Sequence, residues 1–239
     1  MSIIEKLSNI NISTIRHLQV RKSQEAKYKA HSHPKEYDWN WKEKGFNRIA
    51  LVNYMVSKTG GLASNYLEIG CHSNSLFDSV ASLNKIGVDP VCGGTHRMTS
   101  DDFFKQNVMK FDSIFIDGLH EYHQVRRDAI NALESINDGG WIAFHDLLPS
   151  NWKEHHMPRI SDAWTGDCWK AAVELSQAQG VEFKIVEIDH GVGLMRKIEN
   201  HFDVPDLSSQ LSNAEFDKFV EVVEKLPIIS FEEAVELIG

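Results

Sequence analysis

Residues 111–149, FDSIFIDGLHEYHQVRRDAINALESINDGGWIAFHDLLP, form the stretch that decides the fold class. Its two apolar runs, 114–116 and 141–144, are too short for helices and do not alternate with polar residues, which is typical of strands buried on both faces of a parallel sheet. Between them, apolar residues recur at helical spacing from Val125 to Ile136, and NDGG at 137–140 predicts the end of that helix. The segment therefore predicts two parallel strands joined by a helix.

Ionisable residues follow each of these two strands. Asp117 and His120 come after the first strand, and His145 and Asp146 come after the second. Because ligands of open parallel sheets bind outside the carboxyl ends of the strands, we expect all four side chains to face one crevice. Asp117 alone could instead cap the following helix, but the convergence of four ionisable groups favours an active site.

Length and charge narrow the class of protein. The 239 residues suit one α/β domain at 46–199, with an N-terminal appendage at 1–45 and a C-terminal helical extension at 200–239. The net charge of -9 argues against nucleic acid and membrane surfaces as partners. Residues 1–35 carry seven Lys or Arg against two Glu, and we interpret this basic arm as solvated or in contact with another subunit. The terminal extensions could thus support a homo-oligomer.

Cysteine usage and hydropathy indicate the compartment. The three cysteines are widely spaced and predict neither a disulfide framework nor a CxxC metal site. The N-terminus lacks the apolar run of a signal peptide, and no segment approaches the ~20 apolar residues of a membrane span. The expected location is therefore the reducing cytoplasm. The histidines at 31, 33, 155 and 156 lie in polar, loop-like sequence, and we interpret them as surface residues.

The whole pattern predicts a mostly parallel seven-stranded sheet whose last strand is antiparallel. The turn DHG at 189–191 is too short for a parallel crossover and indicates a hairpin. Ser212 with Glu215, and Ser230 with Glu233, are capping-box signatures that predict C-terminal helices. Further strands are expected at 66–69, 85–88, 96–99, 183–188 and 192–196, and further helices at 46–58, 75–83, 100–106 and 167–179.

The first expected strand carries a second chemical signal. It leaves the sheet through Glu68, Ile69 and Gly70, and a glycine at that point lets the backbone approach a ligand closely. The next strand ends at Asp89, where a carboxylate can accept both ribose hydroxyls of a nucleoside. The dinucleotide fingerprint GxGxxG is absent.

Taken together, the chain closely resembles the class I S-adenosylmethionine-dependent methyltransferases over about residues 65–197. One departure is Asn74, which stands where the family's ExGxxxG pattern has its last glycine; asparagine tolerates left-handed backbone angles better than most residues. The resemblance implies a Rossmann-like fold with helices on both faces of the sheet. It rests on four motifs: TSDDFF at 99–104, IDGLHEY at 116–122, GGWIAFHD at 139–146 and GDCWK at 166–170.

The resemblance also implies cofactor roles for individual residues. Glu68 and Gly70 would lie in the first cofactor loop, beside the methionine and ribose moieties of S-adenosylmethionine. Asp89 would bind the ribose hydroxyls. Ser100 and Asp101, after the short third strand, would lie near the adenine.

The acidic strand ends further resemble those of metal-dependent O-methyltransferases that act on small molecules and macrolide sugars. That likeness implies a divalent ion, Mg²⁺ or Mn²⁺, held by Asp117, His145 and Asp146; the nitrogen donor of His145 suits Mn²⁺ better than Mg²⁺. Without a metal, His120 would be the general base for an acceptor hydroxyl. Asp117, His120 and His145 are therefore the expected catalytic residues, and the choice between metal and base stays open.

The expected activity is methyl transfer to a hydroxyl of a small-molecule acceptor, such as a sugar or another small polar compound. The aromatic residues Tyr37, Trp39 and Trp41 and the irregular segment 149–164 are candidate walls for that acceptor. Two other functions remain open. A catalytically silent nucleoside-binding domain would need no acidic cluster, and a nicotinamide-dependent oxidoreductase should have the GxGxxG turn.

Overall fold

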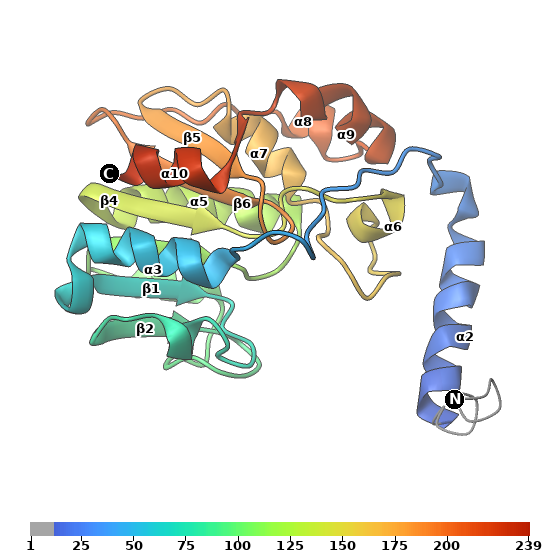
Figure 1. The fold of residues 1–239 in the computed structure, drawn as a ribbon, viewed down its shortest axis with the longest axis horizontal. Coiled ribbons are helices and arrows are strands. Elements are labelled where there is room, and N and C mark those ends of the chain that lie inside the picture. Colours follow the sequence, from blue (N-terminus) through green and yellow to red (C-terminus); the bar gives the residue numbers. More distant parts are fainter. Residues whose placement is uncertain (1–11) are drawn as a thin grey trace.

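The computed structural model describes residues 12–239, and the first eleven residues of the expected basic arm lie outside this range. Its centre is one seven-stranded sheet in the order β2-β1-β3-β4-β6-β5-β7 (Figure 1). The strands are β1 Asn65–Ile69, β2 Asn84–Val88, β3 Phe111–Ile116, β4 Ile136–Phe144, β5 Val181–Val186, β6 Val192–Lys197 and β7 Ile228–Ile229.

Strands β1 to β4 are parallel, and their carboxyl ends lie level with one another. Ile69 pairs with Val88 on one side and with Ile116 on the other, and Ile116 pairs with Phe144. The next residue of each strand therefore emerges at one edge of the sheet. The predicted unit of two strands and a helix is confirmed, with α5 Tyr122–Ser135 between β3 and β4.

The hairpin predicted at 189–191 is also present. Strand β6 is antiparallel to both of its neighbours, β4 and β5. Asp189, His190 and Gly191 all have positive φ, which turns the chain within a few residues. The turn between β5 and β6 consequently lies at the same edge of the sheet as the carboxyl ends of β1 to β4.

Two elements differ from the sequence-based expectation. The strand expected at 96–99 is reduced to a single bridge between His96 and Val88, and the seventh strand is β7, which pairs in parallel with β5. The helix expected at 75–83 is a single 3-10 turn, η3 Phe77–Ser79. Lys85 Nζ donates to the carbonyl oxygen of Phe77 in this turn and to that of Val80 directly after it, so neither carbonyl group needs a helical partner.

Helices cover both faces of the sheet. On one face, α3 Arg48–Thr59 and α10 Phe231–Ile238 pack on alternate strand residues that include Tyr66, Phe115 and Leu194. On the other face, α5 and α7 Trp169–Leu175 pack on the intervening residues, among them Leu67 and Ile142. The remaining helices are α2 Ile12–Lys27, which stands apart from the sheet in Figure 1, α4 Ser100–Gln106, α6 Trp152–His155, α8 Ser208–Leu211 and α9 Phe216–Val222.

One of the two predicted capping boxes forms. Ser230 and Glu233 cap α10 reciprocally. The expectation for Ser212 and Glu215 is wrong, because Glu215 contacts histidines instead: its carboxylate lies 3.3 Å from His31 Nδ1 and 3.6 Å from His155 Nε2.

Two histidines that were expected at the surface are buried. The exposed fractions of His155 and His156 are 3% and 1%. Trp169 Nε1 donates to His155 Nδ1 at 2.9 Å, and His156 Nδ1 lies 2.9 Å from the carbonyl oxygen of Pro158. Local polarity did not reveal this burial, because Trp169 reaches His155 from α7 and the ring of Tyr28 packs 4.5 Å from that of His156.

The aromatic residues of the N-terminal segment dock on the core. Tyr37 and Trp39 stack at 5.3 Å between ring centroids, and Trp39 and Trp41 at 5.8 Å. The backbone N–H of Tyr37 donates to Ser150 O, and Trp39 Nε1 donates to Pro149 O. This segment therefore lies against the start of the loop that follows β4.

Candidate active site

The site begins with a row of residues at the carboxyl edge of the sheet. Gly70 N donates to Val88 O, Asp117 N to Ile69 O and His145 N to Ile116 O, at 2.8 to 3.0 Å. The parallel ladder thus continues one residue beyond each strand. This regular extension sets Gly70, Asp117 and His145 side by side, as strand-end reasoning predicted.

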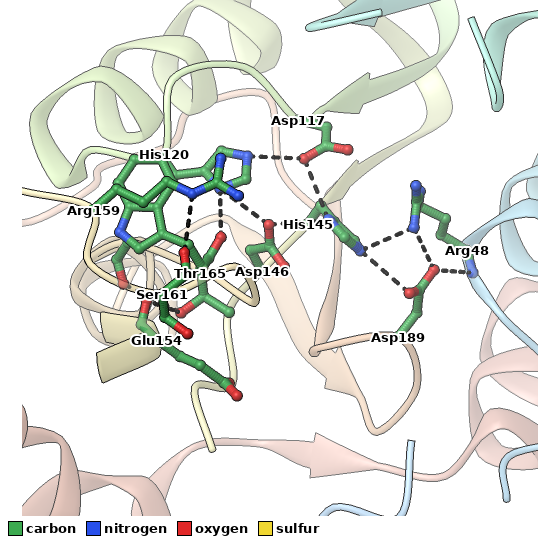
Figure 2. A network of polar contacts seen from close by, with 12 residues as sticks. Arg48, Asp117, His120, His145, Asp146, Glu154, Arg159, Ser161, Thr165 and Asp189 are labelled. Atoms are coloured by element: carbon green, nitrogen blue, oxygen red, sulfur yellow. Dashed lines mark hydrogen bonds and ion pairs between the residues drawn. The ribbon is translucent and has the colours of Figure 1, made fainter. Parts of the chain in front are cut away.

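Asp117, His120, His145 and Asp146 come together at this edge (Figure 2). Asp117 Oδ1 lies 3.3 Å from His120 Nε2 and 3.2 Å from His145 Nδ1. Asp146 Oδ2 lies 3.1 Å from His120 Nδ1 and 3.3 Å from His145 Nδ1. Asp146 has a φ of 64°, which ends the strand alternation and lets the side chains of neighbouring residues 145 and 146 reach the same cluster. The predicted convergence is present.

The charges in this cluster are strongly coupled. Burial lowers the pKa of His145, but the nearby carboxylates of Asp146 and Asp117 outweigh burial and hold that pKa well above its usual value. Burial also lowers the pKa of His120, and the hydrogen bond and charge of Asp117, with the charge of Asp146, raise it overall. Burial raises the pKa of Asp117, yet the two histidines lower it well below its usual range. The cluster favours imidazolium–carboxylate pairs.

Arg48 and Asp189 extend the network behind His145, and sequence reasoning missed both. Asp189 Oδ2 accepts from Arg48 Nη1 at 2.7 Å and from the backbone N–H of Arg48 at 3.2 Å. His145 Nε2 lies 3.7 Å from Asp189 Oδ1 and 3.5 Å from Arg48 Nη1. The sequence pattern indicates Asp189 only as a turn residue. Its position after β5, at the same sheet edge, was the available signal.

The loop after β1, which is the expected cofactor loop, builds the other side of the site. Glu68 is 2% exposed, and Tyr66 Oη donates to its Oε2 at 2.6 Å. Burial raises the pKa of Glu68 to about 7, against a hydrogen bond from Tyr66 that lowers it. Gly70 has a φ of 86°, and a Cβ there would lie 2.0 Å from the carbonyl oxygen of Asp117. Only glycine lets the two loops approach so closely.

Asp89 organises the loop after β2. Its carboxylate accepts from the backbone N–H groups of His72, Val91 and Cys92 at 2.8 to 2.9 Å. Partial burial raises the pKa of Asp89, but these three donors and the charge of Arg97 lower it overall. Asp89 therefore stays ionised at neutral pH.

Asn74 keeps the turn that the family pattern builds with glycine. It adopts a φ of 63°, and its Oδ1 accepts from Gly94 N at 2.7 Å. The left-handed conformation is thus stabilised by a side-chain hydrogen bond that glycine could not make.

Ser100 and Asp101 lie at the start of α4, in a network with α5. Gln124 Nε2 donates to Ser100 Oγ, to Asp101 Oδ1 and to buried Asp128. Burial raises the pKa of Asp128 to about 6. Neither Ser100 nor Asp101 lines the cavity beside the acidic cluster.

That cavity has a volume of about 450 Å³ and joins the expected cofactor loop to the acidic cluster. Trp164 closes one side of it by stacking on His120, with ring centroids 5.2 Å apart. The guanidinium of Arg159 lies over the ring of Trp164, 5.6 Å from its centroid. Both come from the segment 149–164, which was expected to border the site. The other lining residues are Arg48, Glu68, Gly70, Cys71, His72, Ser73, Ser75, Leu76, Asp89, Asp117, Gly118, Leu119, His145 and Asp146.

The cluster fits a divalent cation. Within residues 12–239, Asp117, His120 and Asp146 offer ligand atoms that all lie within 4.8 Å of one another. His145 Nδ1 is buried and makes no well-directed hydrogen bond, although it lies against oxygens of the same two carboxylates. The geometry thus brings His120 into the group, whereas the expected third ligand was His145. Carboxylate and imidazole donors together suit Mn²⁺ or a similar transition metal.

Comparison with known proteins gives one match to a family model, one curated relative and several solved structures. Residues 66–147 match a family model described as a methyltransferase domain. A protein of Acanthamoeba polyphaga mimivirus, named only as uncharacterised, is 25% identical in an alignment that covers 40% of this chain and 57% of that protein. The chain thus spans less than two thirds of the length of this relative.

Two of the solved structures that are similar to this chain are O-methyltransferases. The O-methyltransferase from Bacillus cereus, in complex with S-adenosylhomocysteine, is 13% identical with a TM-score of 0.43, covering 80% of this chain and 93% of that one. The O-methyltransferase TomG from Streptomyces achromogenes, in complex with S-adenosylmethionine, is 13% identical with a TM-score of 0.44, covering 62% and 78%.

No helix within residues 12–239 is both long and apolar enough to cross a membrane. The sheet has the predicted Rossmann-like arrangement, with β6 antiparallel among parallel neighbours. The strand ends present Glu68, Gly70 and Asp89 beside one cavity. Over residues 66–147, the chain is thus similar to a methyltransferase domain.

Proposed function

We propose that the protein transfers the methyl group of S-adenosylmethionine to a hydroxyl of a small polar acceptor, such as a sugar. The observation that carries this proposal is the position of the cluster of Asp117, His120, His145 and Asp146. It lies in the same cavity as the cofactor loop, at the carboxyl ends of neighbouring parallel strands. A domain that only binds nucleosides would not need four ionisable side chains there.

The chain's residues would mainly position the reactants. S-adenosylmethionine, when bound, supplies an electrophilic methyl group. The loop containing Gly70 and the carboxylate of Asp89 would hold the donor, and the cavity would align the acceptor oxygen with the methyl group and the sulfur. His120, which is 21% exposed in its side chain, would take the proton of the hydroxyl. Its raised pKa makes it a stronger base than an ordinary histidine.

A divalent cation is the alternative to this base. Asp117, His120 and Asp146 would hold it, and His145 would orient the two carboxylates from behind, as partners of metal ligands commonly do. When bound, such an ion would supply a Lewis acid that lowers the pKa of the acceptor hydroxyl. His120 cannot serve both as a ligand and as the base, so the two schemes exclude each other.

The acceptor would enter beside the segment 149–164. Trp164 and Arg159 line the cavity at that end, and the docked aromatic residues of the N-terminal segment contact the beginning of the same loop. The flat faces of aromatic side chains suit the apolar faces of a sugar ring.

We also propose that the protein is located in the cytoplasm, which the three free cysteines support. We further propose a homo-oligomer in which the basic helix α2, which stands apart from the sheet in Figure 1, contacts a second subunit.

Calorimetry with S-adenosylhomocysteine, with NAD as the competing ligand, tests the donor. Preferential binding of S-adenosylhomocysteine supports the proposal, and tighter binding of NAD would favour an oxidoreductase. Transfer from labelled S-adenosylmethionine to a panel of sugars and small alcohols then tests the acceptor. Strong binding of S-adenosylhomocysteine without transfer, in the presence and absence of Mn²⁺, would favour a catalytically silent binding domain.

A further inference from the structure

One arginine in the wall of the cavity has no carboxylate partner. Arg159 lines the end of the cavity that the segment 149–164 forms, and it makes no ion pair with the described residues. The carboxylate nearest to it in its own loop, that of Asp162, pairs with Arg21. By contrast, the other arginine of the lining, Arg48, pairs with Asp189. The positive charge of Arg159 is therefore left for a ligand.

The guanidinium of Arg159 is held in one orientation and keeps donors free. Its Nε donates to Ser161 O at 3.1 Å, and its Nη2 donates to Asp162 O at 2.8 Å. The ring of Trp164 supports it, with 5.6 Å between guanidinium and ring centroid. Within residues 12–239, Nη1 has no hydrogen-bond acceptor. A guanidinium fixed by two carbonyl groups and an aromatic ring, with free N–H groups, is organised in advance to bind an oxyanion.

This guanidinium lies close to the candidate base or metal ligand, His120. The ring of His120 stacks on that of Trp164 with an interplanar angle of 15°, and His120 Nδ1 lies 3.2 Å from Trp164 O. Because Arg159 and His120 both pack on Trp164, no more than one aromatic ring separates them. Figure 2 shows both on the same side of His145, away from Arg48. One small molecule can therefore place a hydroxyl at His120 and an anionic group at Arg159.

The loop that carries Arg159 is fastened to the rest of the fold. Trp164 Nε1 donates to His156 O at 2.9 Å. Gly166 has a φ of 60°, and a Cβ there would lie 1.9 Å from His120 O, so only glycine lets the loop approach this residue so closely. The position of Arg159 beside His120 is thus set by packing on both sides of the loop.

We propose that Arg159 binds an anionic group of the methyl acceptor, which makes the acceptor an acidic sugar or a similar small acid. This inference rests on the proposed function, because it assumes methyl transfer to a hydroxyl at His120. A carboxylate or a phosphate would balance the charge of Arg159 and form charge-assisted hydrogen bonds with its free donors. The hydroxyls of a neutral sugar would leave that charge unbalanced.

Selenate tests the anion site without knowledge of the acceptor. Crystals of the protein with S-adenosylhomocysteine are soaked in selenate, and the anomalous signal of selenium locates the ion. We expect selenate within hydrogen-bond distance of Arg159 Nη1 in the wild type, and none there in Arg159→Met. Arg21→Met is the matched control, because Arg21 pairs with Asp162 of the same loop but does not line the cavity. It should bind selenate as the wild type does.

Transfer to matched sugars tests whether the acceptor uses this site. Glucuronate carries a carboxylate and glucose 6-phosphate a phosphate, whereas glucose carries no anionic group. For the better of the two acidic sugars, the wild type should show a kcat/KM about tenfold or more above that for glucose, the usual effect of a hydrogen bond between charged groups. Arg159→Met should remove this preference, and Arg159→Lys should keep part of it. The better substrate shows which anion the site takes.

The outcomes separate this inference from the function on which it rests. Absence of selenate at Arg159 in the wild type would overturn the inference, and this result decides alone if none of the three sugars is methylated. Selenate at Arg159 with no preference for acidic sugars would mean an adventitious ion only, which overturns it too. Equal losses for acidic and neutral sugars in Arg159→Met would show that Arg159 only shapes its loop. If the wild type did not bind S-adenosylhomocysteine, the proposed function itself would fail.

Discussion

Replacing Glu68 by glutamine should make the protein more stable at neutral and higher pH. Glu68 is buried at the wall of the candidate active site and accepts a hydrogen bond from Tyr66 Oη. Burial raises the pKa of Glu68 to about 7 from an ordinary value of 4.5. Glutamine keeps the shape and the acceptor oxygen but cannot ionise, so Glu68→Gln imitates the protonated form.

The size of the effect follows from the two pKa values. A carboxyl group whose pKa is raised on folding stabilises the folded state fully below about 4.5, and this contribution is lost as pH rises to about 7. The difference between the two values corresponds to about 3 kcal/mol. We therefore expect the wild type and Glu68→Gln to have similar free energies of unfolding near pH 4.5. Above pH 7, the variant should be more stable by up to about 3 kcal/mol.

Urea denaturation at a series of pH values measures this difference directly. The quantity of interest is the free energy of unfolding of Glu68→Gln minus that of the wild type, because contributions from all other groups cancel. Asp128→Asn is the control, since burial raises the pKa of Asp128 to about 6 from 3.8, and its difference should change over that lower range of pH. A difference for Glu68→Gln that did not change between pH 4.5 and 7 would refute the reasoning.

Three further predictions concern the acidic cluster and a buried network. If His120 is the base, kcat/KM for methyl transfer should rise with pH through a midpoint above 6.5, because the neutral form is required and the pKa of His120 is raised. Asp146→Asn should move that midpoint to lower pH, and an unmoved midpoint would contradict the assignment. If a metal is used, treatment with a chelator should abolish transfer, Mn²⁺ should restore it, and Asp117→Asn should remove Mn²⁺ binding in calorimetry. Glu174 is fully buried and accepts hydrogen bonds from Tyr122 Oη, Arg126 Nε and Leu207 N. Glu174→Ala should therefore lower the free energy of unfolding, measured in urea titrations, by about 3–5 kcal/mol. Any protein that still folds should bind S-adenosylhomocysteine normally.

The ends of the parallel strands could be predicted because a buried strand leaves a recognisable pattern in its own stretch of sequence. A strand buried on both faces leaves a short apolar run, and the first polar residue after it marks the edge of the sheet. Asp117 and His145 were located in this way, and Gly70 was located as the glycine that leaves the first strand; the hydrogen bonds that continue the ladder to their N–H groups explain the success. The hairpin at 189–191 was predictable for a related reason, since its length excludes a crossover.

Other features depended on contacts between distant segments, and no local pattern encodes those. Arg48 and Asp189 are 141 residues apart and meet beside His145 only because α3 and the turn after β5 reach the same edge. The hydrogen bond of His155 with Trp169 and the packing of Tyr28 against His156 gave buried partners to side chains in polar sequence. Strand β7 is two residues long and too short for any periodicity, so its pairing with β5 was decided by the packing of the C-terminal segment. Sequence alone determined which residues end β1 to β4, whereas the tertiary structure decided the partners of those residues, because burial and charge pairing depend on segments of the chain that meet in space.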